Sequence, residues 1–134
     1  MISGFPSAEE YETEKARYSD STHVDIRDHQ AGIGGQYRNE VLSNVNDDCL
    51  RLSVLDREYP WHYHADSDEL FLVVDGKLQV EVSGKELVEL SEWQYVVVPA
   101  GVVHRTRAVG RTVTLTFEKQ AARTVFVEPA DAGD

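Results

Sequence analysis

The sequence predicts an all-β fold, either an antiparallel sandwich or a small barrel, with a short helix near its N-terminus. Apolar residues alternate with polar ones over much of the chain, as at Leu50, Leu52 and Val54, and this period of two is that of a strand. Turn residues such as Asp75-Gly76 and Ser83-Gly84 separate the alternating segments at short intervals. A chain of 134 residues without an internal repeat is expected to form one such domain. A barrel of this size has an interior that holds one small ligand.

The N-terminal helix is predicted from a capping box in Ser7-Ala8-Glu9-Glu10, in which the Ser7 hydroxyl caps the helix and Glu10 reaches back. The helix is expected to cover residues 8–18. Its apolar stripe is thin, which predicts that it packs on the outside of a larger body. The stripe consists of Ala8, Tyr11 and Tyr18. Gly32, Gly34 and Gly35 then indicate a loop or turn.

A β-hairpin is predicted around Asp75-Gly76. This dipeptide lies between the apolar residues 70–74 and the alternating residues 78–82. Both of its residues tolerate positive φ, which the tight turns of hairpins require. Ser83-Gly84 begins the turn that follows.

The rest of the chain adds strands and sets the expected organisation. Further strands are predicted at residues 95–98, closed by Pro99-Ala100-Gly101, and then at residues 112–117 and 123–128. We expect three parts in all: an N-terminal extension of helix and strand that packs on the barrel, the barrel itself, and a frayed tail. These parts are expected at residues 1–48, 49–128 and 129–134.

Composition and charge exclude several classes of partner. The formal net charge is −11, from 24 acidic and 13 basic residues, and it repels nucleic acid and anionic membrane. No apolar run approaches the roughly 20 residues of a spanning helix, and the start lacks the features of a signal peptide. The single Cys49 excludes an intramolecular disulfide, so a cytoplasmic setting is expected. Because Asp47 and Asp48 disfavour a thiolate, Cys49 is interpreted as a buried structural thiol.

Three of the five histidines fall in two short segments that also carry a carboxylate at fixed spacing. His62 and His64 must share one face of a strand, because side chains alternate along it. Glu69 follows a turn-like stretch and is expected to open the next, antiparallel strand, from which it returns to the same interior. His104 comes from a distant strand, just after a Pro-x-Gly turn. Three imidazoles and one carboxylate suit a divalent transition metal, so these four residues are the predicted metal ligands.

The combined motifs resemble those of the cupin superfamily. The first motif is His-x-His-x4-Glu-x6-Gly, and the second is Pro-x-Gly-x2-His; they consist of His62, His64, Glu69 and Gly76, and of Pro99, Gly101 and His104. The chain is most similar to small single-domain cupins described as mannose-6-phosphate-isomerase-like, over residues 50–117. This resemblance implies a double-stranded β-helix, or jelly-roll barrel, and frequent homodimers. It also implies one divalent transition metal per chain, which is Fe, Mn, Ni, Co, Cu or Zn in the family.

Two positions depart from the family pattern. Trp93 stands where the second motif often begins with glycine, which predicts a differently shaped turn. Ala108 stands where that motif often ends with asparagine, which removes a polar group near the end of the strand. Neither position is a ligand, so the expected metal site stands.

Catalytic residues are harder to predict than the metal ligands. Tyr59 is a candidate for the mouth of the barrel, although aromatic packing explains it equally well. Thr106 shares the parity of His104 and, with Phe71, is a candidate lining residue. Tyr95 is a candidate acid or base only if its strand turns it inward.

Other polar residues near the motifs have structural interpretations. Tyr63 points away from the ligands by parity, which favours packing or a subunit contact. Arg105 and Arg107 lie on the face opposite His104 and are interpreted as ion-pair partners or a dimer contact rather than a substrate clamp. His23 and His29 have no partner at ligand spacing and are predicted to be surface histidines.

Three functions remain open from the sequence. The first is a metal-dependent enzyme whose small hydroxy or keto substrate chelates the ion. Within it we favour oxygenase chemistry with Fe, and Lewis-acid isomerase, epimerase or lyase chemistry is the alternative. The second is a non-catalytic barrel that binds a small ligand. The third is a metal-free acid–base catalyst, and Glu69 argues against it, because a carboxylate facing three histidines is better explained by a shared ion.

Overall fold

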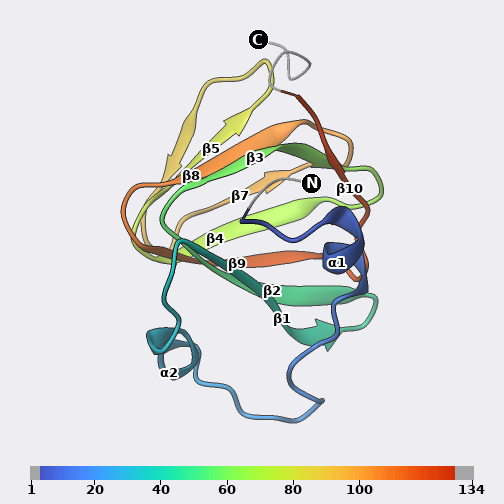
Figure 1. The fold of residues 1–134 in the computed structure, drawn as a ribbon, viewed down its shortest axis with the longest axis vertical. Coiled ribbons are helices and arrows are strands. Elements are labelled where there is room, and N and C mark those ends of the chain that lie inside the picture. Colours follow the sequence, from blue (N-terminus) through green and yellow to red (C-terminus); the bar gives the residue numbers. More distant parts are fainter. Residues whose placement is uncertain (1–3, 129–134) are drawn as a thin grey trace.

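Two antiparallel sheets of five strands face each other in this protein, whose computed structural model describes residues 4–128 (Figure 1). In spatial order the first sheet contains β1 (Tyr37–Val45), β2 (Asp48–Leu55), β9 (Thr112–Lys119), β4 (Glu69–Asp75) and β7 (Tyr95–Val98). The second sheet contains β10 (Thr124–Phe126), β3 (Glu58–His64), β8 (His104–Ala108), β5 (Leu78–Val82) and β6 (Val88–Leu90). The predicted all-β fold is confirmed, and the predicted strands at residues 95–98, 112–117 and 123–128 correspond to β7, β9 and β10.

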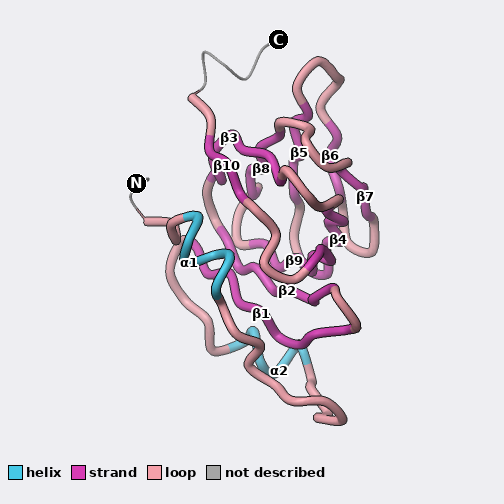
Figure 2. Tube along the Cα trace, turned by 90° about the vertical axis from the view of Figure 1, so that its right-hand side faces the viewer, coloured by secondary structure: helices cyan, strands magenta, loops and turns pink. Residues whose placement is uncertain are grey.

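The alternation in β2 and β9 places the apolar residues of these two strands on the outer face of the first sheet. Leu52 and Val54 of β2 form one buried cluster with Val113 and Leu115 of β9 and with Leu42 of β1. Segments that precede β1 cover this cluster, and the covering side chains are Tyr18, Ile26 and Ile33. Figure 2 shows the second helix beneath β1, on the side away from the second sheet. The polar residues between the apolar ones therefore face the interior.

The N-terminal extension contains two short helices, α1 (Ala8–Thr13) and α2 (Ile26–Ala31). The predicted capping box is confirmed, because Ser7 and Glu10 make both of its hydrogen bonds. The predicted end of this helix at residue 18 was wrong. The chain becomes extended at Glu14, and the amides of Arg17 and Tyr18 donate to backbone carbonyls of β1 instead. Pairing with a neighbouring strand thus replaces the helical bonds that these residues would have made.

The second helix was not predicted. Its first turn is capped by Asp25, whose carboxylate accepts a hydrogen bond from the amide of Asp28. Its six residues are too few to show a helical period in the sequence, so tertiary packing through Ile26 supports it.

The hairpin predicted around Asp75-Gly76 was also wrong. Its two strands belong to different sheets, since β4 pairs with β7 and β9 whereas β5 pairs with β6 and β8. The dipeptide carries the chain from one sheet to the other. Gly76 has φ +90°, so the local signal for positive φ was read correctly although the pairing partner was not. The hairpin of the second sheet instead joins β5 to β6 through the turn at Ser83-Gly84.

The turn before β7 holds a residue that the sequence singled out. Trp93 has φ +68°, in the left-handed region that favours glycine. Its amide donates to the carbonyl of Val73, which ties the turn to β4. The tryptophan therefore adopts a backbone conformation that a glycine would take without strain.

Two further expectations concern the ends and surroundings of the chain. The tail predicted at residues 129–134 lies outside the described residues. Within residues 4–128, no helix is both long and apolar enough to span a membrane.

Replacing Gly76 by alanine is expected to lower the free energy of unfolding by about 3 kcal/mol, because strain at positive φ adds to a steric clash. A Cβ at this position would lie 2.7 Å from the carbonyl oxygen of Arg111 and 2.9 Å from the Cα of Thr112. Gly84→Ala is the matched control, since Gly84 has φ +78° but nothing within 4 Å of the added Cβ. It is expected to lose only about 1 kcal/mol. Urea unfolding measures both values, and equal losses would contradict the close approach at Gly76.

Candidate metal centre

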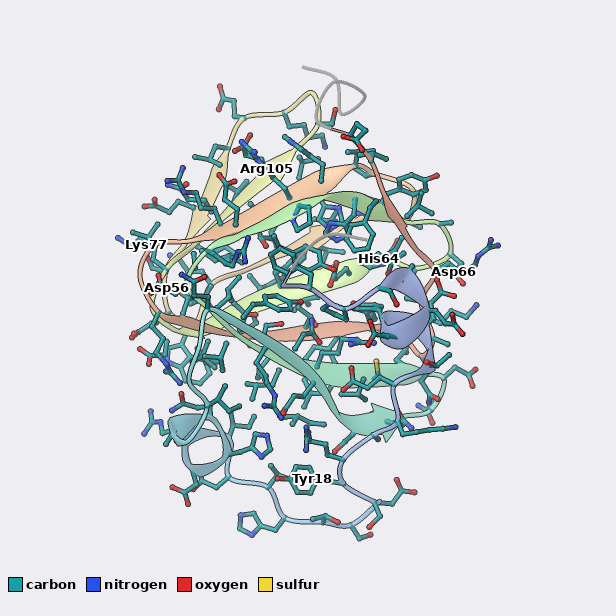
Figure 3. All side chains as sticks on the ribbon, in the orientation of Figure 1. Tyr18, Asp56, His64, Asp66, Lys77 and Arg105 are labelled. Atoms are coloured by element: carbon teal, nitrogen blue, oxygen red, sulfur yellow. The ribbon has the colours of Figure 1, made fainter. Side chains whose placement is uncertain are left out.

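Four buried side chains from three strands meet between the two sheets. His62 and His64 lie on β3, His104 begins β8, and Glu69 begins β4. Their candidate ligand atoms all lie within 4.8 Å of one another. The second sheet therefore supplies the three imidazoles and the first sheet supplies the carboxylate. The structure brings together all four residues that the sequence selected, and Figure 3 shows His64 in the middle of the molecule.

Backbone carbonyls fix the orientation of two of the imidazoles. The Nδ1 atom of His62 lies 2.8 Å from the carbonyl oxygen of Pro60, and the Nδ1 atom of His104 lies 2.9 Å from that of Val102. A carbonyl oxygen only accepts, so each Nδ1 carries the proton and each Nε2 keeps its lone pair. This is the arrangement in which metal-binding histidines are usually held.

Glu69 lies against two of the three imidazoles, those of His64 and His104. Its Oε1 atom is 3.0 Å from Nε2 of His64 and 3.3 Å from Nε2 of His104. On the far side of the His64 ring, Nδ1 lies 3.1 Å from the hydroxyl of Thr124 on β10. The carboxylate oxygen and the imidazole nitrogens thus converge on one small volume.

The charges of the cluster follow from burial and from these contacts. Burial, reinforced by His104 and His64, lowers the pKa of His62 to about 3, so this ring is neutral. Burial also works to lower the pKa of His64, but the Glu69 carboxylate outweighs it and the pKa is raised. Burial raises the pKa of Glu69, yet His64 and His104 outweigh that effect and hold it well below its usual range. A carboxylate kept ionised among imidazoles fits a divalent transition ion, which replaces the protons that these groups otherwise share.

Three residues beside the cluster were not identified from the sequence. The ring of Tyr11 stacks on His64 with 5.6 Å between ring centroids, and its hydroxyl donates to Glu118. The guanidinium of Arg51 lies 3.6 Å from the centroid of the Tyr11 ring. Burial, together with the charge on Glu69, raises the pKa of Glu118 to about 8 although Arg51 opposes the shift. The parity of Glu118 with the threonines of β9 could have placed it inside; the position of Tyr11 had no such signal.

A narrow cavity borders the cluster. Its volume is about 30 Å³, which is room for a few water molecules. Tyr59, His62 and Thr106 line it from the second sheet, and Glu69 and Phe71 are among the residues that line it from the first. The N-terminal extension closes one side, where the ring of Phe5 packs edge-on against those of Tyr37 and Tyr59.

Two of the three candidate catalytic residues line the cavity, and the third does not. Tyr59 and Thr106 are paired across β3 and β8 and both line the cavity. Tyr95 is 64% exposed at the edge of the first sheet and does not reach the cavity. Its strand does not turn it inward, so the condition under which it was a candidate is not met.

The remaining polar residues near the motifs lie where parity places them, outside the cluster. Arg105 bonds Glu81 at 2.8 Å and stacks on Trp61, which confirms the predicted ion pair on the outer face. Arg107 lies on the same face, 3.8 Å from Glu58.

His29 corrects the prediction of two surface histidines. His23 is exposed, but the side chain of His29 is only 16% exposed and lies between two partners. Its Nδ1 atom is 2.6 Å from the Tyr18 hydroxyl and its Nε2 atom is 2.7 Å from the carboxylate of Glu40. The three residues meet only after the extension folds onto β1, so spacing in the sequence could not reveal them.

Cys49 has the properties predicted for a structural thiol. It is buried on β2, and burial raises the pKa of its thiol to about 11. The thiolate population at neutral pH is therefore very small.

Two facing sheets with three inward histidines and a glutamate define a β-barrel of the cupin type, and these four side chains could hold a metal ion. The family model for the cupin domain matches residues 54–117. The chain is also 45% identical over 93 residues to the protein YdbB of Bacillus subtilis, which covers 69% of this chain and 82% of YdbB. The chain belongs to the cupin superfamily. The finer likeness to mannose-6-phosphate-isomerase-like cupins, and the homodimer, stay predictions.

Solved structures agree with this assignment. A cupin-2 domain protein from Shewanella frigidimarina has a TM-score of 0.67 at 27% identity, covering 72% of this chain and 93% of its own. Protein NMB1881 from Neisseria meningitidis has a TM-score of 0.66 at 26% identity, covering 73% and 99%. A protein with a double-stranded β-helix domain from Klebsiella pneumoniae has a TM-score of 0.69 at 15% identity, covering 81% and 93%, and this likeness concerns the fold alone.

His104→Ala is expected to abolish stoichiometric metal binding and to leave the fold largely intact, because it removes one of four ligands without touching the other three. Elemental analysis of protein loaded with one equivalent of Mn, Fe or Zn measures the metal, and circular dichroism measures the fold. His23→Ala, at an exposed position outside the cluster, is the control and should retain full metal content. Unchanged metal content in the folded His104 variant would disprove the ligand assignment.

Proposed function

We propose that this chain is a metal-dependent enzyme that acts on a small, oxygen-rich molecule, with His62, His64, Glu69 and His104 holding one divalent transition ion. The observation that carries the proposal is the position of the cluster. Two residues of the cluster, His62 and Glu69, also line the cavity, so a molecule in the cavity lies beside the candidate ligand atoms. A purely structural site has no need of such a cavity.

The ion, when bound, supplies either activation of dioxygen, if it is redox-active, or Lewis-acid polarisation of a substrate oxygen. The residues of the chain provide the surroundings for either chemistry. Leu55, Phe71 and Leu78 form the apolar part of the cavity lining, and an apolar lining disfavours bound water. For the oxygenase chemistry that the sequence favours, with Fe as the ion, this shielding protects reactive species from side reactions.

The second candidate is isomerase, epimerase or lyase chemistry, and a specific observation favours it. Such reactions move protons, and the cavity contains the buried tyrosine Tyr59 beside a ligand. Its ring centroid lies 4.8 Å from that of His62. Burial, with the neighbouring Tyr37 and Glu69, raises the pKa of Tyr59 well above its usual value. The hydroxyl therefore keeps its proton at neutral pH and is available as an acid or as a hydrogen-bond donor to a substrate oxygen.

The two chemistries are separated by metal analysis combined with oxygen uptake. Protein purified without chelators or a nickel-scavenging tag is expected to contain about one divalent transition ion per chain. Uptake of oxygen that depends on both Fe(II) and a small hydroxy or keto compound supports the oxygenase. Conversion of such a compound with Mn, Zn or Ni and without uptake supports proton-transfer chemistry. Bound metal without turnover of any compound in a broad panel would identify a ligand-binding barrel instead.

Tyr59→Phe tests the proton-transfer candidate. Loss of the hydroxyl is expected to lower kcat by about 10²-fold, because proton transfer by a positioned side chain contributes at least that much, with little change in metal content. Tyr95→Phe is the matched control at the exposed edge and should keep full activity. Steady-state kinetics of the two variants make the comparison, and equal activity of both would remove Tyr59 from the chemistry.

A further inference from the structure

A row of neutral polar side chains on the first sheet faces the four candidate metal ligands, here called the metal cluster. Asn39 of β1 lies opposite Ser53 of β2, and Ser53 lies opposite Thr114 of β9. Thr116 follows two residues further along β9, opposite Phe71. All four residues, here called the polar wall, line the same cavity as His62 and Glu69.

Thr116 shows that the polar wall is not built for stability alone. Its side chain is 3% exposed, and its hydroxyl has no hydrogen-bond partner among residues 4–128. Burial of a hydroxyl without a partner costs free energy, and a valine would fill the same space without that cost. Thr112, on the same face of the same strand, is the contrast. Its hydroxyl lies 3.0 Å from the carbonyl of Lys77 and 3.2 Å from the amide of the same residue.

The lining of the cavity determines the charge that a ligand can carry. Neither lysine nor arginine lines it, and Glu69 is its one acidic residue among the described part of the chain. Arg51 lies on the same inner face but does not line the cavity, and its buried Nε atom has no hydrogen-bond partner among residues 4–128. Its Nη1 atom donates to Asn39 at 2.9 Å and its Nη2 atom donates to the carbonyl of Tyr11 at 2.9 Å. A phosphate or carboxylate directed at the polar wall would be buried without a counter-charge, which is strongly unfavourable.

We infer that the polar wall is the substrate-recognition surface, and that it selects small neutral molecules carrying hydroxyl groups over their anionic analogues. This inference rests on the proposed function, because it places the reactive end of the molecule at the metal cluster and the opposite end at the polar wall. The hydroxyls of Ser53, Thr114 and Thr116 both donate and accept, which matches the hydroxyl groups of a polyol or hydroxycarbonyl compound. The small volume of the cavity favours a compact ligand.

Dihydroxyacetone and its phosphate are a matched pair of probes for this inference. Isothermal titration calorimetry with the manganese-loaded chain measures both affinities. The neutral ketone is expected to bind at least tenfold more tightly than the phosphate, because the polar wall offers hydrogen bonds but no cation. Equal or tighter binding of the phosphate would overturn the inference.

Thr116→Val locates the binding on the polar wall. The variant is expected to weaken binding of dihydroxyacetone by about tenfold, the value of one hydrogen bond, while its metal content stays unchanged. Its thermal stability should stay level or rise, because the hydroxyl that is lost has no partner. Thr112→Val is the matched control, which is expected to lose stability.

Two results separate the failure of this inference from that of the proposed function. Full metal content with unchanged binding of dihydroxyacetone by Thr116→Val would overturn the role of the polar wall and leave the metal enzyme standing. Absence of metal binding by the wild-type chain would overturn the proposed function. In that case the same titrations on the metal-free chain still decide whether the polar wall prefers the neutral ketone.

Discussion

The packing of the N-terminal extension on the outer face of the first sheet is the constraint on which the interior depends. The strands β2 and β9 of that sheet each have an apolar outer face and a mainly polar inner face, and only a covered face can be apolar at low cost. Tyr18, Ile26 and Ile33 cover the outer face, where Leu52 and Val113 are fully buried. Because the N-terminal extension covers the apolar outer face of this sheet, the polar faces of β1, β2 and β9 can point toward the metal cluster.

Charged contacts hold this extension in place. The buried carboxylate of Glu40 on β1 bonds Arg17 at 2.7 Å, His29 at 2.7 Å and Arg38 at 2.8 Å. Burial raises the pKa of Glu40, but these partners outweigh it and the pKa is lowered, so the carboxylate is ionised. At the other end of the extension, Tyr11 stacks on His64. The same continuous segment therefore makes the ion pairs with Glu40 on the outside of the barrel and the ring contact with His64 at the metal cluster.

The four candidate metal ligands could be predicted from the sequence because local structure, namely strand parity and a turn, determines where they point. Parity sets His62 and His64 on one face, and the turn before Glu69 returns the carboxylate to them. The same parity does not say which face is the interior, since an apolar row is equally consistent with a core or with an outer layer under another segment. Nor does a turn signal name a pairing partner, which is why Asp75-Gly76 joins two sheets rather than two paired strands. Tyr11 and His29 gain their roles from residues far along the chain, and no local pattern encodes such contacts.

The two sheets contribute different chemical groups to the site. The second sheet contributes three imidazoles, and the Nδ1 atoms of His62 and His104 are anchored on backbone carbonyls, so the positions of these two rings follow the local backbone. The first sheet contributes the carboxylate at one end of a face that is partly apolar, through Phe71, and partly hydroxylic, through Thr114 and Thr116. The apolar part lowers the local dielectric and strengthens every charge interaction in the cluster. The hydroxylic part offers directional hydrogen bonds without charge, and so directs selectivity to the shape and hydroxylation of a molecule rather than to its anionic groups.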